Sequence, residues 1–236
     1  MRKSIHIIAP IFAAIAFLSS EAVGQNQKLA QAGMQFLNVG AGAQQTAMGE
    51  AFTAVEGASL SMFYNPASMA RLSALYDISL GQTQWIAEIN HNFASVAISP
   101  SNGDYGVFGI MLQFVDYGKL QETIRSSNAQ GFLDIGTFHP TATAVGLGYA
   151  RALSDRFSVG GNVKSVTQNL ANGTVALDNY GNPTRTESSK NLLVFDFGML
   201  YRTGFKSLNF GVAIRNFSEE VKYEREGFQL PLIFKI

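Results

Sequence analysis

Three charged side chains stand out because they fall in stretches of the chain that otherwise carry few charges. Lys164, Asp196 and Arg215 each lie in a segment where apolar and polar residues alternate, on the face of small and polar residues. A charge buried without a partner is costly, so three charges of mixed sign predict a ladder with Asp196 in the middle. Such a ladder would hold neighbouring elements in register. Ion selection and simple hydration in a wet interior are the alternatives.

Groups that could perform catalysis are scarce. The chain has no cysteine, which excludes thiol catalysis, disulfides and Cys-based zinc sites. His91 and His139 belong to no metal-spaced motif such as H-E-x-x-H. Ser95 would lie about 13 Å from His91 along a strand, too far for proton transfer. We therefore predict no catalytic residue, no cofactor and no metal, and expect that the protein is not an enzyme.

The composition narrows the class of protein. Among 236 residues there are 17 Lys and Arg against 17 Asp and Glu, so no basic excess exists to neutralise a nucleic acid. Hydrophobic residues make up 47% of the chain, which excludes disorder. Charged residues reach only 14%, whereas glycine and phenylalanine are abundant. This balance indicates contact with lipid.

From about residue 72 onward the sequence alternates with a period of two, which predicts β-strands. One face of these strands carries bulky apolar residues: Phe108, Ile110, Leu112, Phe114, Val145, Leu147, Tyr149, Phe195, Phe197, Met199 and Tyr201. The other face carries mainly Gly, Ala, Ser and Asn. A soluble sandwich would also alternate, but the predicted strands are longer than usual in soluble proteins. We therefore predict an all-β fold, a transmembrane antiparallel β-barrel with its apolar face toward lipid. Phe195→Arg should then destabilise it more than Gly198→Ser.

The spacing predicts a barrel wall over residues 72–236, with about eight strands. These begin near Leu72, Ile86, Asp104, Thr141, Arg156, Lys190, Ser207 and Gln229. Short and long connections alternate, as in outer-membrane barrels, and residues 119–140, 171–190 and 218–227 form the long, outward-facing loops. Because the last strand is short, we expect a larger barrel that is incomplete at the C-terminus. A complete eight-stranded barrel is the alternative.

The first 24 residues predict a secretory signal peptide. Arg2 and Lys3 precede an apolar run over residues 5–18, and small residues end the segment at Ala22-Val23-Gly24. An N-terminal membrane anchor is the alternative, although the run is shorter than the ~20 residues a spanning helix needs. No later stretch is apolar enough for such a helix, so a membrane position would require a closed barrel.

Residues 25–71 lack strand periodicity and predict a hatch inside the barrel mouth. Gly40, Gly42 and Gly49 permit sharp turns of the backbone. Pro66 disfavours a helical Asn65, so a short helix over residues 59–64 should end before it. A segment of about 47 residues is too small to fold as an independent domain.

The chain resembles the PorV/PorQ family of outer-membrane proteins, which are relatives of the FadL fatty-acid channels. The motifs that carry this resemblance are Val39-Gly40-Ala41-Gly42-Ala43, Met48-Gly49, Tyr64-Asn65-Pro66-Ala67, Gln84-Trp85-Ile86, Asp116-Tyr117-Gly118, residues 149–161, and Leu230-Pro231-Leu232. Asn65-Pro66-Ala67 is the most telling, since FadL-like hatches carry it. The resemblance implies a fourteen-stranded barrel, of which six strands would be absent here.

The resemblance also implies a place and a role. The protein would lie in the bacterial outer membrane and act as a cargo or partner platform in type IX protein secretion. Its partners would be outer-membrane lipid, secreted cargo proteins and other type IX components, with no nucleic acid. A FadL-like channel for hydrophobic small molecules and a structural outer-membrane protein are the alternatives. Small and polar inward positions favour the platform.

Overall fold

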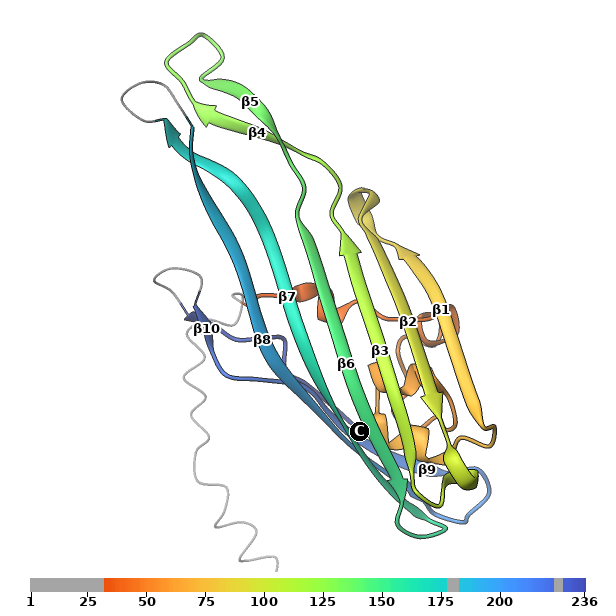
Figure 1. Ribbon diagram of the computed structural model, residues 1–236. Coiled ribbons are helices and arrows are strands. Elements are labelled where there is room, and N and C mark those ends of the chain that lie inside the picture. The colour runs from red at the N-terminus through yellow and green to blue at the C-terminus, as the bar shows by residue number, and fades with distance from the viewer. Residues whose placement is uncertain (1–31, 178–182, 223–226) are drawn as a thin grey trace, which may run out of the picture. The chain divides into compact units, whose positions relative to one another are not determined.

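The computed structural model describes residues 32–177, 183–222 and 227–236 (Figure 1). The predicted signal peptide and residues 25–31 of the predicted hatch lie outside these ranges. The described residues form mostly antiparallel sheet, which confirms the all-β prediction. Among them, no helix is long and apolar enough to cross a membrane.

One large sheet organises the molecule. Its strands, in spatial order, are β1 (Tyr76–Gln84), β2 (Asn90–Ile98), β3 (Val107–Asp116), β6 (Thr141–Ala152), β7 (Phe157–Leu177), β8 (Pro183–Arg202), β9 (Asn209–Phe217) and β12 (Ile233–Lys235), and every neighbouring pair is antiparallel. The sheet has eight strands, as the alternation predicts. Within the described residues it is open, with β1 and β12 at its edges, and does not close into the predicted barrel.

The connections contain more strand than the sequence predicts. β7 runs to Leu177 and β8 starts at Pro183, so most of the predicted loop 171–190 is a strand pair. Residues 119–140 hold the hairpin of β4 (Leu120–Arg125) and β5 (Phe132–Phe138), and β10 (Val221–Lys222) pairs with β11 (Gly227–Phe228). Alternation detects strands with one apolar face, and the β4–β5 hairpin and the far ends of β7 and β8 lie beyond the main body of the sheet (Figure 1), where no such pattern is required. The β10–β11 pair is only two residues long in each strand, which is too short for a periodic pattern.

The two faces of the sheet are inverted relative to a soluble protein. We call outer the face that carries Phe108, Ile110, Leu147 and Phe197, and inner the opposite face. Phe108 is 50% exposed and Leu147 is 64% exposed, whereas Val107 and Ala144 on the inner face are fully buried. The predicted segregation of large apolar from small and polar side chains is therefore confirmed.

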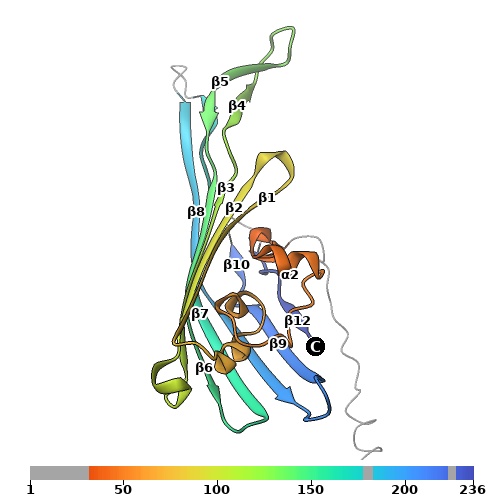
Figure 2. The same cartoon turned by 90° about the vertical axis from the view of Figure 1, so that its right-hand side faces the viewer.

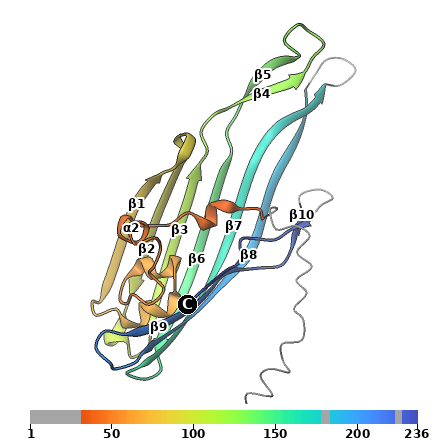
Figure 3. The same ribbon diagram turned by 180° about the vertical axis from the view of Figure 1, so that it is seen from behind.

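Residues 32–75, which we call the N-terminal segment, cover the inner face. They form η1 (Gln35–Asn38), α2 (Ala43–Ala47), η2 (Ser59–Phe63) and η3 (Pro66–Arg71), of which the η elements are 3-10 helices. Figures 2 and 3 show these short helices on one side of the sheet. The helix predicted over 59–64 corresponds to η2, which ends before Asn65 as Pro66 requires.

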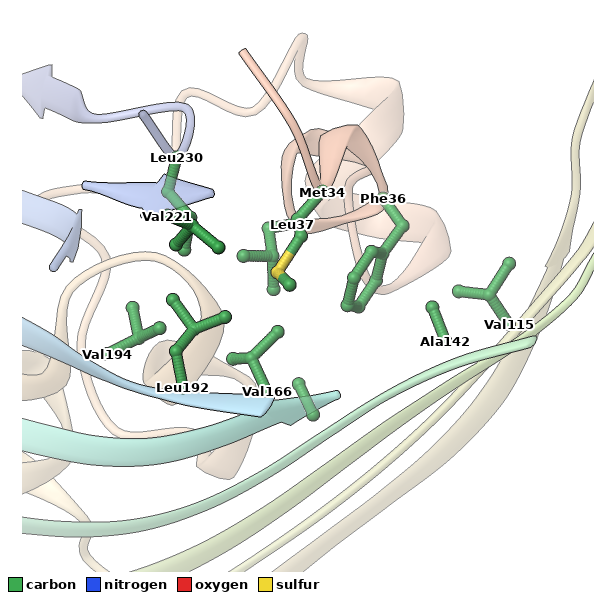
Figure 4. Close-up of a cluster of buried hydrophobic side chains, with 11 residues drawn as sticks. Met34, Phe36, Leu37, Val115, Ala142, Val166, Leu192, Val194, Val221 and Leu230 are labelled. Atoms are coloured by element: carbon green, nitrogen blue, oxygen red, sulfur yellow. The ribbon is translucent and has the colours of Figure 1, made fainter. Parts of the chain in front are cut away.

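The hydrophobic core lies between the N-terminal segment and the inner face. One cluster joins Met34, Phe36 and Leu37 to the inner side chains of β3, β6, β7 and β8 and to Val221 and Leu230 (Figure 4). A second cluster joins Met62, Phe63, Tyr64 and Met69 to Ala97, Val107, Met111 and Ala150. The sheet thus buries its inner face against the segment that precedes it in sequence.

Glycines on the inner face let the N-terminal segment approach the sheet closely. A Cβ added at Gly198 would overlap the side-chain oxygen of Asn65. A Cβ at Gly160 would lie 2.7 Å from the backbone nitrogen of Ala67 and 2.7 Å from the carbonyl carbon of Pro66. The inner face at Gly198 therefore has no space for a side chain, so Gly198→Ser, which the sequence predicts to be milder than Phe195→Arg, should itself be destabilising.

We expect Gly160→Ala to lower the free energy of unfolding by about 1–3 kcal/mol, since the added methyl group meets backbone that cannot rotate away. Gly161→Ala is the matched control, because Gly161 lies on the outer face and its Cβ would come no nearer than 3.2 Å to another heavy atom. Denaturant titration of the folded protein measures both. Equal losses would show that the close approach at Gly160 is unimportant.

Candidate functional site

Asn65, Pro66 and Ala67 anchor the N-terminal segment to the sheet. Asn65 is completely buried, and its side-chain oxygen accepts a hydrogen bond from the Ala67 nitrogen at 3.1 Å. Its side-chain amide donates to the Thr53 carbonyl at 2.7 Å and to the Met199 carbonyl of β8 at 3.0 Å. Asn65 therefore caps η3, with Pro66 at the first helical position, and binds the sheet with the same side chain.

The three predicted hatch glycines all shape the segment around α2. Gly42 and Gly49 have backbone φ angles of +93° and +63°, values that residues other than glycine rarely adopt. Gly40 needs its small size, because an added Cβ would lie 3.0 Å from a Glu50 carboxylate oxygen and 3.2 Å from the Tyr64 hydroxyl. The resulting turn brings the Ala41 carbonyl within 2.8 Å of that hydroxyl, which donates to it.

Lys164 and Asp196 form a buried ion pair on the inner face. The Lys164 Nζ lies 2.8 Å from Asp196 Oδ1, and the two side chains are 4% and 1% exposed. The same carboxylate oxygen accepts the Asn216 backbone N–H at 2.8 Å, and the other oxygen accepts the Asn162 amide at 3.3 Å. Lys164 also donates to the Asn216 side-chain oxygen at 2.8 Å. These hydrogen bonds offset the desolvation of the pair.

A β-bulge in β9 turns two consecutive side chains inward. The register between β8 and β9 shifts between Phe195 and Phe197, and Asn216 has a φ of +61°. Arg215 and Asn216 are therefore both buried. Asn216 was not singled out from the sequence. The two adjacent polar residues, which interrupt the alternation before Phe217, are the signal that could have identified it.

Arg215 departs from the predicted ladder. Among the described residues it makes no ion pair with Asp196, so Asp196 does not sit between two bonded cations. Its Nη2 donates to the Leu37 carbonyl at 3.4 Å, and its guanidinium carbon lies 5.5 Å from the centre of the Tyr64 ring. Burial raises the pKa of Tyr64 to about 12, so its hydroxyl stays neutral and donates to Ala41. Arg215 thus contacts the N-terminal segment rather than its neighbour on the sheet.

We name Asn162, Lys164, Asp196, Arg215 and Asn216 the polar junction. Besides their mutual contacts, these side chains bind backbone carbonyls outside the sheet. Asn162 donates to Met62 at 2.7 Å, Arg215 to Leu37, and Asn216 to Pro231 at 3.1 Å. The junction therefore holds two segments of chain against the inner face, one that precedes β1 and one that connects β11 to β12.

The histidines do not join the polar junction. His91 lies buried on β2 with its ring in a T-shaped contact with that of Trp85, and Ser95 donates to the Ser59 hydroxyl at 3.0 Å. His139 is exposed and bonds the Asp116 carboxylate. In the parts of the chain that the structure describes, no three His, Cys, Asp or Glu side chains are grouped so that they could hold a metal ion. What the polar junction can do is hold segments in place.

Comparison with known proteins gives no family for the chain. No family model matches the sequence, and a search of the curated proteins finds no similar one. The resemblance to the PorV/PorQ family therefore stays a prediction that depends on its motifs. A function has to be inferred from the outer face of the sheet and from the polar junction.

Proposed function

We propose that the eight-stranded sheet contributes to the wall of an outer-membrane β-barrel of the PorV/PorQ type, with the N-terminal segment as its hatch. In this proposal the protein is a non-enzymatic platform for cargo or partner proteins in type IX secretion. The observation that carries the membrane position is the apolar outer face.

Large apolar side chains cover the outer face from strand to strand. Those at least 40% exposed include Ile78, Leu80, Phe108, Ile110, Leu112, Val145, Leu147, Val163, Phe197, Met199 and Phe210. Soluble monomers rarely expose contiguous apolar patches beyond a few hundred Å². In a membrane, lipid hydrocarbon replaces water around these side chains, so their exposure on the outer face is not unfavourable.

The large apolar side chains of the outer face form a band across the strands, and this apolar band has a boundary at each end of the strands. At the end with short turns, the outer face carries two cross-strand aromatic pairs, Phe108 with Tyr149 and Tyr201 with Phe210, and Tyr76 at the edge strand. At the other end Thr143, Thr167 and Asn191 stand opposite one another. From Asn191 to Tyr201 the strand covers 11 residues, in agreement with the about 9–11 that cross a bilayer when tilted. Aromatic rows at the interfaces are typical of outer-membrane barrels.

Two features support a platform more than an open channel. The inner face is occupied by the N-terminal segment. The two hydrophobic clusters and the polar junction hold this segment in place. Beyond the polar boundary, β4–β5 and the ends of β7 and β8 extend past the other strands (Figure 1). The β4–β5 hairpin exposes Leu120, Phe132 and Leu133, which could contact a protein partner.

The proposal can be tested in cells by replacing residues 120–138, which hold β4 and β5, with a short Gly-Ser connection. We expect the variant to reach the outer membrane while the amount of type IX cargo at the cell surface falls at least tenfold. Unchanged cargo would contradict the platform. If the intact protein instead supported saturable uptake of a fatty acid, the channel would be the better description.

The orientation of the protein gives a separate prediction. Because the chain has no native cysteine, a thiol reagent that cannot cross the membrane reports a single introduced site. We expect Ser127→Cys, in the β4–β5 connection, and cysteines within residues 171–190 to be labelled on intact cells. Ser154→Cys, in the turn between β6 and β7, should be labelled only after lysis. Equal labelling of both ends on intact cells would contradict this topology.

A further inference from the structure

Two cationic side chains lie on neighbouring turns at the end of the sheet with short turns. Arg156 belongs to the turn between β6 and β7, and Lys206 belongs to the turn between β8 and β9. The Arg156 guanidinium packs against the second turn, since a Cβ added at Gly204 would lie 3.3 Å from its Nη2. Gly204 is two residues from Lys206, so the two cations belong to one small region of the surface.

Hydrogen bonds hold both turns in shape. The Arg202 backbone N–H donates to the Arg156 carbonyl at 2.8 Å, which ties the end of β8 to the β6–β7 turn. Within that turn the Ser154 hydroxyl accepts the Arg156 N–H at 3.3 Å, and in the β8–β9 turn the Thr203 hydroxyl accepts the Phe205 N–H at 3.0 Å. Both turns therefore keep a defined backbone conformation without a ligand, which lowers the entropic cost of binding one.

The two cations have no ionic partner. Both side chains are exposed, and neither makes an ion pair with another described residue. Of the carboxylates at this end of the sheet, Glu56 binds Arg202. Asp155 lies in the same turn as Arg156 without reaching ion-pair distance of it. Two cations against this one carboxylate leave the region positively charged.

Exposed apolar side chains adjoin the cations. Leu153 and Phe205, one in each turn, are 60% and 67% exposed, and the Lys206 Nζ lies 5.7 Å from the centre of the Phe205 ring. The boundary of the apolar band at Tyr201 is two residues before the β8–β9 turn, and two strand residues span about 7 Å. Lipid headgroups extend about 5–7 Å beyond the hydrocarbon. In the proposed membrane position, the two turns therefore lie at the level of the headgroups.

Resting on the proposed membrane position of the outer face, we propose that Arg156 and Lys206 bind the phosphate of an anionic phospholipid, whose glycerol and upper acyl carbons contact Leu153 and Phe205. Arg156 binds the phosphate oxygens through its planar fork, and Lys206 acts as a point charge. The apolar neighbours favour a lipid over free phosphate, which has no apolar part. The two cations favour an anionic lipid over a zwitterionic one, because a zwitterionic headgroup brings its own positive charge.

Fluorescence quenching by brominated lipids tests this inference. Phe210→Trp in a Trp85→Phe background places the only tryptophan on the outer face near the two turns. This parent protein is folded into phosphatidylcholine vesicles that contain a fixed fraction of either brominated phosphatidylglycerol or brominated phosphatidylcholine. Each cation near an anionic surface is worth up to about fivefold in affinity and Asp155 offsets part of it, so we expect phosphatidylglycerol to be preferred on the order of tenfold.

Arg156→Gln combined with Lys206→Gln should abolish this preference. Quenching by brominated phosphatidylcholine should persist, which shows that the variant still lies in the bilayer. Lys119→Gln combined with Arg125→Gln is the matched control, because it removes two exposed cations at the opposite end of the strands, and should keep the preference. Replacing chloride by inorganic phosphate at constant ionic strength should also leave it unchanged.

The outcomes separate this inference from the membrane proposal. Equal quenching of the parent protein by both lipids would overturn the headgroup site and leave the membrane position intact. A preference that free phosphate removes, or that the double variant at Arg156 and Lys206 retains, would overturn the site as well. If neither lipid quenched the tryptophan, the membrane position itself would be contradicted.

Discussion

Asp196→Asn is expected to lower the free energy of unfolding by about 3–5 kcal/mol, because it leaves the buried Lys164 ammonium without its counter-charge. Lys164 is almost completely buried, so water cannot replace the lost carboxylate. The amide could still accept the Asn216 N–H, so the strands should remain paired. We therefore expect the loss to appear first where the polar junction holds the N-terminal segment. Denaturant titration measures the change in the free energy of unfolding. Hydrogen–deuterium exchange of residues 35–47 and 59–71 reports the local loosening of the N-terminal segment.

The double variant Lys164→Met with Asp196→Leu is the control for this prediction. Removing both charges leaves no unpaired ion, and well-packed apolar replacements of buried pairs are often neutral. We expect the double variant to recover most of the stability that Asp196→Asn loses. If Asp196→Asn unfolded within about 0.5 kcal/mol of wild type, the three charges would be solvated side chains rather than a junction.

Phe197→Arg should cost about 2–4 kcal/mol if its side chain faces the bilayer midplane. Phe197 is 53% exposed on the outer face and lies on β8 between Asn191 at the polar boundary and Tyr201 near the short turn. Tyr201→Arg is the matched control, because the same substitution near the interface should cost only about 0–1 kcal/mol. Reversible folding into lipid vesicles, followed by the heat-dependent gel shift of the folded form, measures both.

The comparison of these two variants separates a membrane wall from a soluble sheet. Tyr201 is 43% exposed, close to the value for Phe197, so in water both arginines would be solvated to a similar extent. Equal costs for the two variants would therefore contradict the lipid position of the outer face. A depth-dependent difference would support it.

Much of the sheet could be predicted from the sequence, because the alternation of apolar and polar residues can be recognised within a single strand. Residues such as Leu147 and Ala144 fall on opposite faces by the period of two alone, and their burial follows it. The hairpins beyond the band could not be predicted in the same way. The β4–β5 hairpin and the far ends of β7 and β8 are held by backbone pairing, which leaves no apolar periodicity.

The polar junction could be predicted only in part. The mixed charges at Lys164 and Asp196 indicated a pair, because neighbouring strands bring their inner side chains together. The partners of Arg215 depend on the bulge at Asn216 and on where Leu37 and Tyr64 fold back, which is not encoded by spacing along one strand. The requirement for Gly160 and Gly198 likewise arises from contact with Asn65, Pro66 and Ala67, which lie far away in the sequence.

The most direct measurement of the central proposal is the depth of the outer face in a bilayer. The chain has a single tryptophan, Trp85, so Phe197→Trp in a Trp85→Phe background gives a second protein with one fluorophore. Vesicles are prepared from lipids brominated at different acyl positions, and quenching by each is recorded. We expect position 197 to be quenched most by bromine near the bilayer centre, and native Trp85, at the β1–β2 connection, by bromine near the headgroups. A tryptophan at position 197 that is not quenched at any depth would contradict the proposal that this face lies against lipid.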